Sequence, residues 1–135
     1  MSTSANIGII YSNGKINGIH VNWDGYPEYV GKVLLEHYND HAKVCDLIDL
    51  GDISFLGKHL NPTSEEHSFD HPERDVTLAY HRDRGEHLHI SRYDDLNEFS
   101  DDHFHNYLYN VDTDEWMYSE GNGSSFQELW TIVNV

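Results

Sequence analysis

The chain has 135 residues, of which 38% are hydrophobic and 13% aromatic, a composition typical of one globular domain rather than of a disordered segment. Asp and Glu number 24 against 8 Lys and Arg, which gives a formal net charge of −16. Such a charge argues against direct binding to nucleic acid or to membranes and favours basic proteins as partners. No apolar run is long enough to cross a bilayer, so we expect a protein of the cytoplasm.

The chain begins with a pattern typical of a β-hairpin. Residues 6–11 and 16–23 are rich in β-branched and aromatic side chains, and Asn13-Gly14 lies between them. Asn-Gly between alternating hydrophobic residues is the strongest short-range signal for a tight hairpin turn. We therefore predict two antiparallel strands at the start of the domain.

Two helices are predicted after this hairpin. Pro27 stands where a first helical turn begins, and the apolar residues from Val30 to Tyr38 recur at helical spacing. A shorter amphipathic pattern follows Asp40 and ends before Gly51, a residue type that commonly terminates helices.

The middle of the chain predicts a loop, a hairpin and a short helix. Residues 58–75 are polar, contain two prolines and show no periodicity, which indicates a long surface loop. Residues 76–80 and 88–93 predict a second hairpin across a turn at 83–86. The acidic stretch 94–102 predicts a short capped helix.

The last third of the chain completes the expected fold. Residues 104–111 and 115–118 predict a third strand pair, and 125–133 predicts a helix that begins with a capping-box pattern. We therefore expect one α+β domain over residues 1–135. Its core is predicted to be a mainly antiparallel sheet of about six strands with helices packed on one face.

Motifs with a well-defined catalytic mechanism are absent from the sequence. It contains no phosphate-binding Gly-rich loop, no Gly-x-Ser-x-Gly, no His-Glu-x-x-His and no Cys-x-x-Cys. Neighbouring carboxylates such as Asp94 and Asp95 serve as acid and base only inside a cleft that keeps one of them protonated. We therefore expect a binding protein rather than an enzyme, and we expect no cofactor.

Two pairs of histidines offer an alternative based on metal chemistry. His87 and His89 are two residues apart on one predicted strand, and so are His103 and His105. Each pair projects to one face of a sheet, where neutral imidazoles are ligands for zinc. Histidines are equally typical of an exposed strand face, and we expect these four to form no tight metal site.

Several segments resemble a known group of proteins. They are His20-Val21-Asn22-Trp23-Asp24-Gly25-Tyr26-Pro27, then Gly31, Leu34-Leu35 and His37-Tyr38, then Leu50-Gly51-Asp52-Ile53-Ser54, and further along Ala79-Tyr80-His81-Arg82-Asp83-Arg84-Gly85-Glu86. The chain resembles a family of small proteins of unassigned function encoded by tailed bacteriophages and prophages. Family members often carry Cys-His where this chain has Val21-Asn22. The resemblance implies phage origin and no particular activity. Together with the cytoplasmic location expected above, it leads us to expect a protein of the host cell cytoplasm.

The block from Trp23 to Pro27 has two interpretations. We expect a corner between strand and helix, in which Trp23 is packed and Gly25 supplies an unusual φ. Alternatively, Trp23, Asp24 and Tyr26 belong to a pocket that binds a small nucleotide-like ligand.

The acidic residues supply the main functional hypothesis. Residues 93–135 contain ten carboxylates and no Lys or Arg. Duplex DNA carries about one charge per 1.7 Å, so a protein that mimics it needs dense acids without interspersed cations. We therefore predict that the chain binds and inhibits a basic or nucleic-acid-binding host protein. The predicted contact residues are Asp94, Asp95, Glu98, Asp101, Asp102, Asp112, Asp114 and Glu115.

Overall fold

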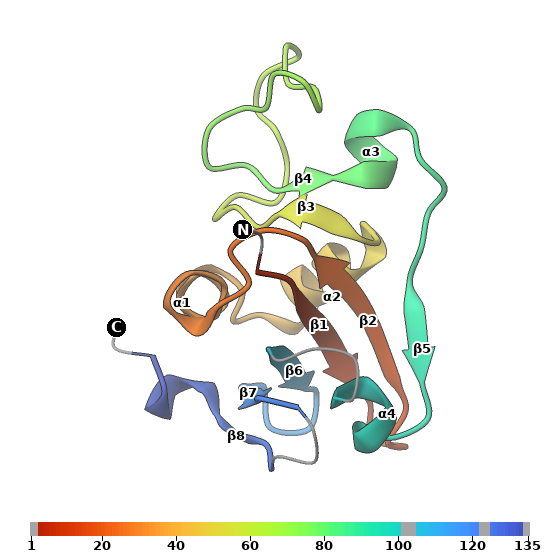
Figure 1. The fold of residues 1–135 in the computed structure, drawn as a ribbon, viewed down its shortest axis with the longest axis vertical. Coiled ribbons are helices and arrows are strands. Elements are labelled where there is room, and N and C mark those ends of the chain that lie inside the picture. Colours follow the sequence, from red (N-terminus) through yellow and green to blue (C-terminus); the bar gives the residue numbers. More distant parts are fainter. Residues whose placement is uncertain (1–2, 101–104, 122–124, 134–135) are drawn as a thin grey trace.

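The computed structural model describes residues 3–100, 105–121 and 125–133, which form an α+β fold with helices on both faces of one sheet (Figure 1). The strands of the described chain are β1 (Ala5–Ile10), β2 (Ile16–Val21), β3 (Ile53–Phe55), β4 (Leu78–Ala79), β5 (Ser91–Tyr93), β6 (Asn106–Asn110), β7 (Glu115–Ser119) and β8 (Gln127–Glu128). The helical segments are the π-helical η1 (Pro27–Gly31), α1 (Lys32–His37), α2 (His41–Asp49), α3 (Tyr80–Arg84), α4 (Leu96–Ser100) and the 3-10 turn η2 (Leu129–Thr131).

The central strand is β1, which joins the two halves of the chain. It pairs antiparallel with β2 and parallel with β6, so that Ile7 lies opposite both Ile19 and Tyr107. The strand order is β4-β3-β2-β1-β6-β7-β8, and β5 also pairs with β2. Within the described residues the sheet is therefore mixed and has 8 strands. The predicted α+β class is confirmed, whereas the prediction of a mainly antiparallel, six-stranded sheet is wrong.

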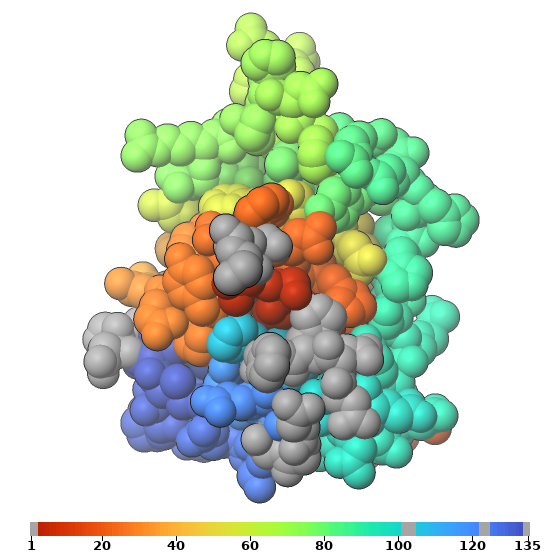
Figure 2. Space-filling model, in the orientation of Figure 1, coloured from red at the N-terminus to blue at the C-terminus, as the bar shows by residue number. Residues whose placement is uncertain are grey.

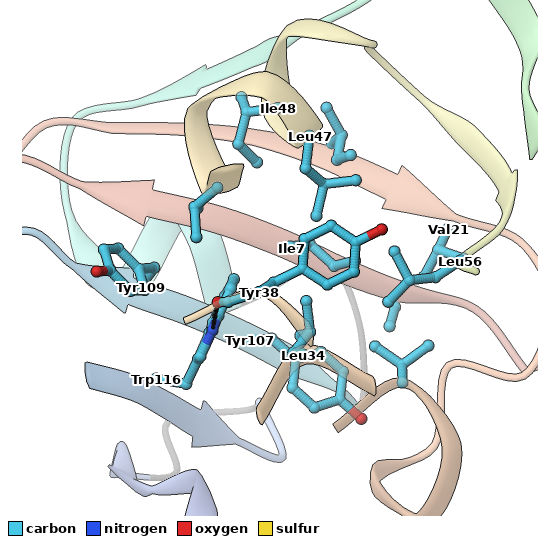
Figure 3. Close-up of a cluster of buried hydrophobic side chains, with 14 of the residues drawn as sticks. Ile7, Val21, Leu34, Tyr38, Leu47, Ile48, Leu56, Tyr107, Tyr109 and Trp116 are labelled. Atoms are coloured by element: carbon cyan, nitrogen blue, oxygen red, sulfur yellow. Dashed lines mark hydrogen bonds between the residues drawn. The ribbon is translucent and has the colours of Figure 1, made fainter. Parts of the chain in front are cut away.

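The main core lies between one face of the sheet and the helices α1 and α2 (Figure 3). Tyr38, directly after α1, is fully buried at its centre. The Tyr38 hydroxyl donates to the Gly57 carbonyl at 2.7 Å, and the Trp116 indole N–H donates to the Tyr38 carbonyl at 2.7 Å. Because buried polar groups without partners are costly, these bonds allow large aromatic side chains to fill the core.

The opposite face of the sheet is covered by α4. Phe99 of α4 lies over two glycines that face each other across β1 and β2. A Cβ atom on Gly8 would stand 2.7 Å from Phe99 Cε1, and one on Gly18 would stand 3.2 Å from it. Asn6 on the same face donates to the Phe99 carbonyl at 3.0 Å. The prediction that helices pack on one face is therefore wrong, because the two glycines leave room for a second layer.

Local signals near the N-terminus predict the structure correctly. The hairpin of β1 and β2 is confirmed, and helical structure runs from Pro27 to His37 as η1 and α1. The Asp40 carboxylate accepts the Ala42 N–H at 3.1 Å and caps α2. Gly51 follows α2 with a φ of 76°, the left-handed conformation that glycine favours.

The predicted hairpin of residues 76–80 and 88–93 is wrong. After β4 the chain turns directly into α3, because the Asp83 carboxylate accepts the Ala79 N–H at 2.7 Å. Gly85 then ends α3 with a φ of 74°. The two short strands pair with separate partners, β4 with β3 and β5 with β2.

The predicted C-terminal helix over residues 125–133 is also wrong. Gln127 and Glu128 pair with the edge of β7 as β8, and one 3-10 turn follows. A strand edge offers backbone hydrogen bonds that outweigh the weak preference of a short helix. The short helix α4 and the hairpin of β6 and β7 agree with prediction, as does a loop after β3 without helix or extended strand up to residue 75.

Candidate functional site

A buried polar cluster fixes the long loop that follows β3. Arg82 donates to the carbonyls of Leu60, at 2.8 Å, and of Thr77, at 2.6 Å. Asp83 accepts from Arg82 Nε at 2.9 Å, and its carboxylate lies 3.1 Å from Nε2 of His67. The side chains of His67 and Asp83 are only 2% and 4% exposed. Charge-assisted bonds therefore tie this loop to α3.

The same loop positions Arg84 at the end of α3. Phe69 from the loop packs against Tyr80, with 5.5 Å between the ring centroids. The Arg84 guanidinium lies 4.4 Å from the centroid of Phe69 and 5.0 Å from that of Tyr80, and it forms an ion pair with Glu86. The two ring contacts and the ion pair together restrict the orientations of the Arg84 guanidinium.

Asp52 fills the gap on the outer edge of β2 between β3 and β5. Its carboxylate accepts the His20 backbone N–H at 2.9 Å and lies 2.9 Å from Nδ1 of His89. Burial by itself raises the pKa of Asp52, but the hydrogen bonds from His20 and His89 outweigh burial and hold this pKa below its ordinary value. The carboxylate is therefore ionised at neutral pH and orients both imidazoles.

These groups border a polar cavity of about 350 Å³, which we call the β2-edge cavity. In Figure 2 the segment around residue 52 (yellow) is visible between β2 (orange) and the segment that follows α3 (teal). The side chains that line the cavity are His20, Asn22, Asp52, Tyr80, Arg84 and Glu86.

The β2-edge cavity collects residues from three of the segments singled out in the sequence, whereas Gly31, Leu34-Leu35 and His37-Tyr38 do not line it. The first segment supplies His20 and Asn22, the second supplies Asp52, and the third supplies the residues of α3 and the turn after it. A hydrogen bond from Asn22 to the Tyr80 hydroxyl joins the first and third segments. No local sequence pattern marks Asp52 and Arg84 as neighbours, so the site cannot be recognised from the sequence alone.

The predicted ligand residues Trp23, Asp24 and Tyr26 do not line this cavity. Trp23 is 49% exposed, so the expectation that it is packed is wrong. Asp24, and not Gly25, has the positive φ, at 57°. Gly25 is required for space instead, since a Cβ atom there would stand 2.8 Å from Cβ of Ala5.

Two stretches that carry predicted acidic residues, around Asp94 and around Asp112, meet at the end of the sheet that holds the β1–β2 turn. Ser12 in this turn donates to the Asp112 carboxylate at 2.6 Å, and Lys15 in the same turn pairs with Asp94 at 3.0 Å. The segments around Asp94 and Asp112, far apart in sequence, therefore flank one turn. We use the name acidic end for Asp94, Asp95, Glu98, Asp112, Asp114, Glu115 and Glu128.

Within the described part of the chain, most carboxylates of the acidic end have no Lys or Arg partner. Among the described residues, Lys15 is the one Lys or Arg that pairs with a member, and it contacts Asp94. The pKa of Glu115 lies above its ordinary value, because its protonated form can donate a hydrogen bond to the neighbouring Glu128 carboxylate and because the two charged forms repel each other. A basic partner would relieve this repulsion.

Two acids of this region also have a local structural role. The Asp95 carboxylate accepts the Glu98 N–H at 2.9 Å, and the Glu98 carboxylate accepts the Asp94 N–H at 2.8 Å. These bonds cap the start of α4. Asp101 and Asp102, which were predicted to belong to the same surface, lie outside the described residues.

The histidines considered for a metal site lie in different surroundings. His87 and His89 precede β5 instead of lying on a strand, so the predicted pairing on one sheet face is wrong for them. Nδ1 of His105 lies 2.6 Å from the Tyr118 hydroxyl, and burial lowers the pKa of His105. His103 lies outside the described residues. In the part of the chain that the structure describes, no three His, Cys, Asp or Glu side chains form a group that could hold a metal ion.

Comparison with known proteins assigns the chain to no family. No protein-family model, no curated protein and no solved structure matches it. Over the described residues, every helix is too short or too polar to cross a lipid bilayer. Function is therefore inferred from the two regions described above, the acidic end and the β2-edge cavity.

Proposed function

We propose that the chain is a phage-encoded binding protein that inhibits or redirects a basic, nucleic-acid-binding protein of the host. The acidic end occupies the groove of this partner and takes the place of nucleic-acid phosphates. The observation that carries the proposal is the meeting of carboxylates from segments near residues 95 and 113 around one turn, with Lys15 as their cationic neighbour.

The charge distribution supports this mode of binding. The formal net charge is −16, and every Lys and Arg of the sequence precedes residue 93. Opposite potentials on two partners accelerate their encounter and disfavour partners of like charge. A partner that normally binds nucleic acid has a basic surface, because phosphate contacts dominate such affinities.

Several carboxylates of the acidic end are held in place before any partner binds. Asp94 is fixed by Lys15, Asp112 by Ser12, and Asp114 by the Tyr109 hydroxyl, which donates to it at 2.6 Å. Groups that are ordered in the free protein lose less conformational freedom on binding. This arrangement favours recognition of a preformed basic groove.

The contact between Glu115 and Glu128 adds a proton-linked component to binding. Because the pKa of Glu115 is raised in the free protein, a basic side chain placed beside it favours the ionised form. Binding therefore releases protons at a pH near this raised pKa, and affinity increases as the pH rises through it.

Neutralising the acidic end tests the proposal. The variant carries Asp95→Asn, Glu98→Gln, Asp112→Asn and Glu115→Gln, which remove four charges and keep groups able to cap α4. Immobilised wild type is expected to retain basic proteins from a bacterial lysate, and duplex DNA is expected to displace them. The variant should retain much less of these proteins, and the difference should shrink as salt is raised.

A matched control separates the acidic end from net charge alone. The control variant carries Asp46→Asn, Asp49→Asn, Glu65→Gln and Glu66→Gln, all at exposed positions away from the acidic end. It has the same net charge as the first variant and should bind like wild type. Equal loss in both variants would contradict a defined interface, and retention in both would contradict the proposal altogether.

A further inference from the structure

We propose that the β2-edge cavity is a binding site for a small, uncharged ligand that carries vicinal hydroxyl groups, such as the ribose of a nucleoside or a monosaccharide. The cavity lies at the end of the molecule that holds β3, β4 and α3 (Figure 1), and its residues belong to none of the groups that form the acidic end. This inference is independent of the proposed function.

The polar groups of the cavity occur as donor and acceptor pairs. Arg84 pairs with Glu86, Asn22 donates to the Tyr80 hydroxyl, and the His20 backbone N–H donates to Asp52. A ligand hydroxyl both donates and accepts, so it can bind beside such a pair without leaving either member unsatisfied. Two neighbouring hydroxyls match the two-pronged geometry of a guanidinium or a carboxylate.

Charge argues against an anionic ligand. Apart from the His20 imidazole, the lining residues carry one cation, Arg84, and two anions, Asp52 and Glu86. An incoming phosphate would have to compete with Glu86 for Arg84 and would be repelled by a chain of net charge −16. An uncharged ligand meets neither obstacle.

The cavity is bordered by fixed loop contacts and is of suitable size. Arg84 lies against both Phe69 and Tyr80, whose rings also contact each other, and Arg82 ties the loop that carries Phe69 to α3 through the Leu60 carbonyl. A volume of about 350 Å³ lies at the lower end of the range for small-molecule sites, roughly 300 to 1,000 Å³. Preorganised polar groups in a cavity of this size suit a ligand of one or two rings.

Titration with defined probes, followed by the NMR shifts of backbone amides, tests the inference. We expect saturable shifts at Asn22, Asp52 and Arg84 with adenosine, ribose or glucose at millimolar concentration. 2′,3′-Dideoxyadenosine, which lacks the vicinal hydroxyls, should bind at least about tenfold more weakly than adenosine, as expected for lost hydrogen bonds. Adenosine monophosphate should bind more weakly than adenosine. Binding of adenosine without ribose or glucose still supports the inference if 2′,3′-dideoxyadenosine binds more weakly, and the ligand is then a nucleoside.

Variants place the binding in the cavity. Asn22→Ala, at an exposed position, should reduce adenosine affinity about tenfold while the melting temperature stays unchanged. Arg84→Gln should also reduce adenosine affinity about tenfold. Arg92→Gln, which changes an exposed arginine outside the cavity, should leave adenosine affinity unchanged. The acidic-end variant should bind adenosine like wild type. The inference is overturned if no hydroxylated probe binds up to about 10 mM, if dideoxyadenosine or the monophosphate binds as tightly as adenosine, or if Asn22→Ala has no effect.

Discussion

At the end of the molecule that holds β3, β4 and α3, the carboxylates of Asp52, Glu73 and Asp83 each accept several hydrogen bonds, and the pKa of each lies below its ordinary value. At the acidic end, Glu115 lies against Glu128, and its pKa is raised. The same residue type therefore stabilises the folded chain in one region and is under electrostatic repulsion in the other.

The difference indicates which acids belong to the fold and which are available to a partner. A carboxylate with a lowered pKa gives up favourable contacts when it is neutralised. Neutralising a carboxylate with a raised pKa stabilises the folded chain. The neutralising group can be a proton, a substituted amide or a basic side chain of another protein. The three predictions below test this contrast in order of expected effect.

The largest effect is expected from Asp83→Ala. This change leaves Arg82 without its carboxylate partner and removes the acceptor of the Ala79 N–H. Breaking a largely buried pair on one side typically costs about 3 to 5 kcal/mol. Urea unfolding should show this loss, whereas Asp112→Asn at the acidic end should change stability by about 0.5 kcal/mol or less. Equal losses in the two variants would remove the contrast.

Low pH should destabilise the folded chain through the carboxylates at the end of the molecule that holds α3. The pKa values of Asp52 and Asp83 lie below the unfolded value of about 3.9. The stability that these two carboxylates contribute is therefore fully present above that pH. It is lost as the pH falls through their pKa values in the folded chain. The urea midpoint of wild type should drop steeply below pH 4, and Asp52→Asn should make this drop shallower. An unchanged slope in Asp52→Asn would show that other groups control acid unfolding.

The smallest change in stability is expected from Glu115→Gln, and this variant should be more stable than wild type, not less. Because the folded pKa is raised, the charged form destabilises the folded chain at neutral pH. The variant should have a slightly higher urea midpoint than wild type at pH 7, and the difference should vanish near pH 3. A lower midpoint at pH 7 would mean that Glu115 stabilises the fold.

The parts of the fold that sequence reasoning predicted correctly depend on local chemistry. Asn13-Gly14 requires a turn, Pro27 opens a helix, and Gly51 ends one. The strands β3, β4 and β5 have only two or three residues and pair with distant segments, so no periodicity marks them. Tertiary hydrogen bonds, such as that of Asp83 with the Ala79 N–H, decide their structure.

The same contrast between local and tertiary information separates the two candidate regions. Exposed acids act through summed charge, which composition reveals, so the sequence alone indicates most residues of the acidic end, although not Glu128. The β2-edge cavity depends on exact neighbours such as Asp52 and Arg84, which only the fold brings together. Trp23 and Trp116 look alike in sequence, yet Trp116 lies opposite Tyr109 in the β6–β7 ladder and is 3% exposed, whereas Trp23 follows the end of β2 and is 49% exposed.

The position of β1 in the middle of the sheet determines the order in which the chain can fold during synthesis. Asn6 pairs with His20 soon after both are made, but its other neighbour, Asn106, is 100 residues further along. At about 5 to 20 residues per second, the ribosome takes about 5 to 20 s to supply that partner. Until then one edge of an apolar strand, of which Ile7 and Ile9 are fully buried in the finished protein, stays open to wrong pairing. A chain that stops before β6 should therefore aggregate.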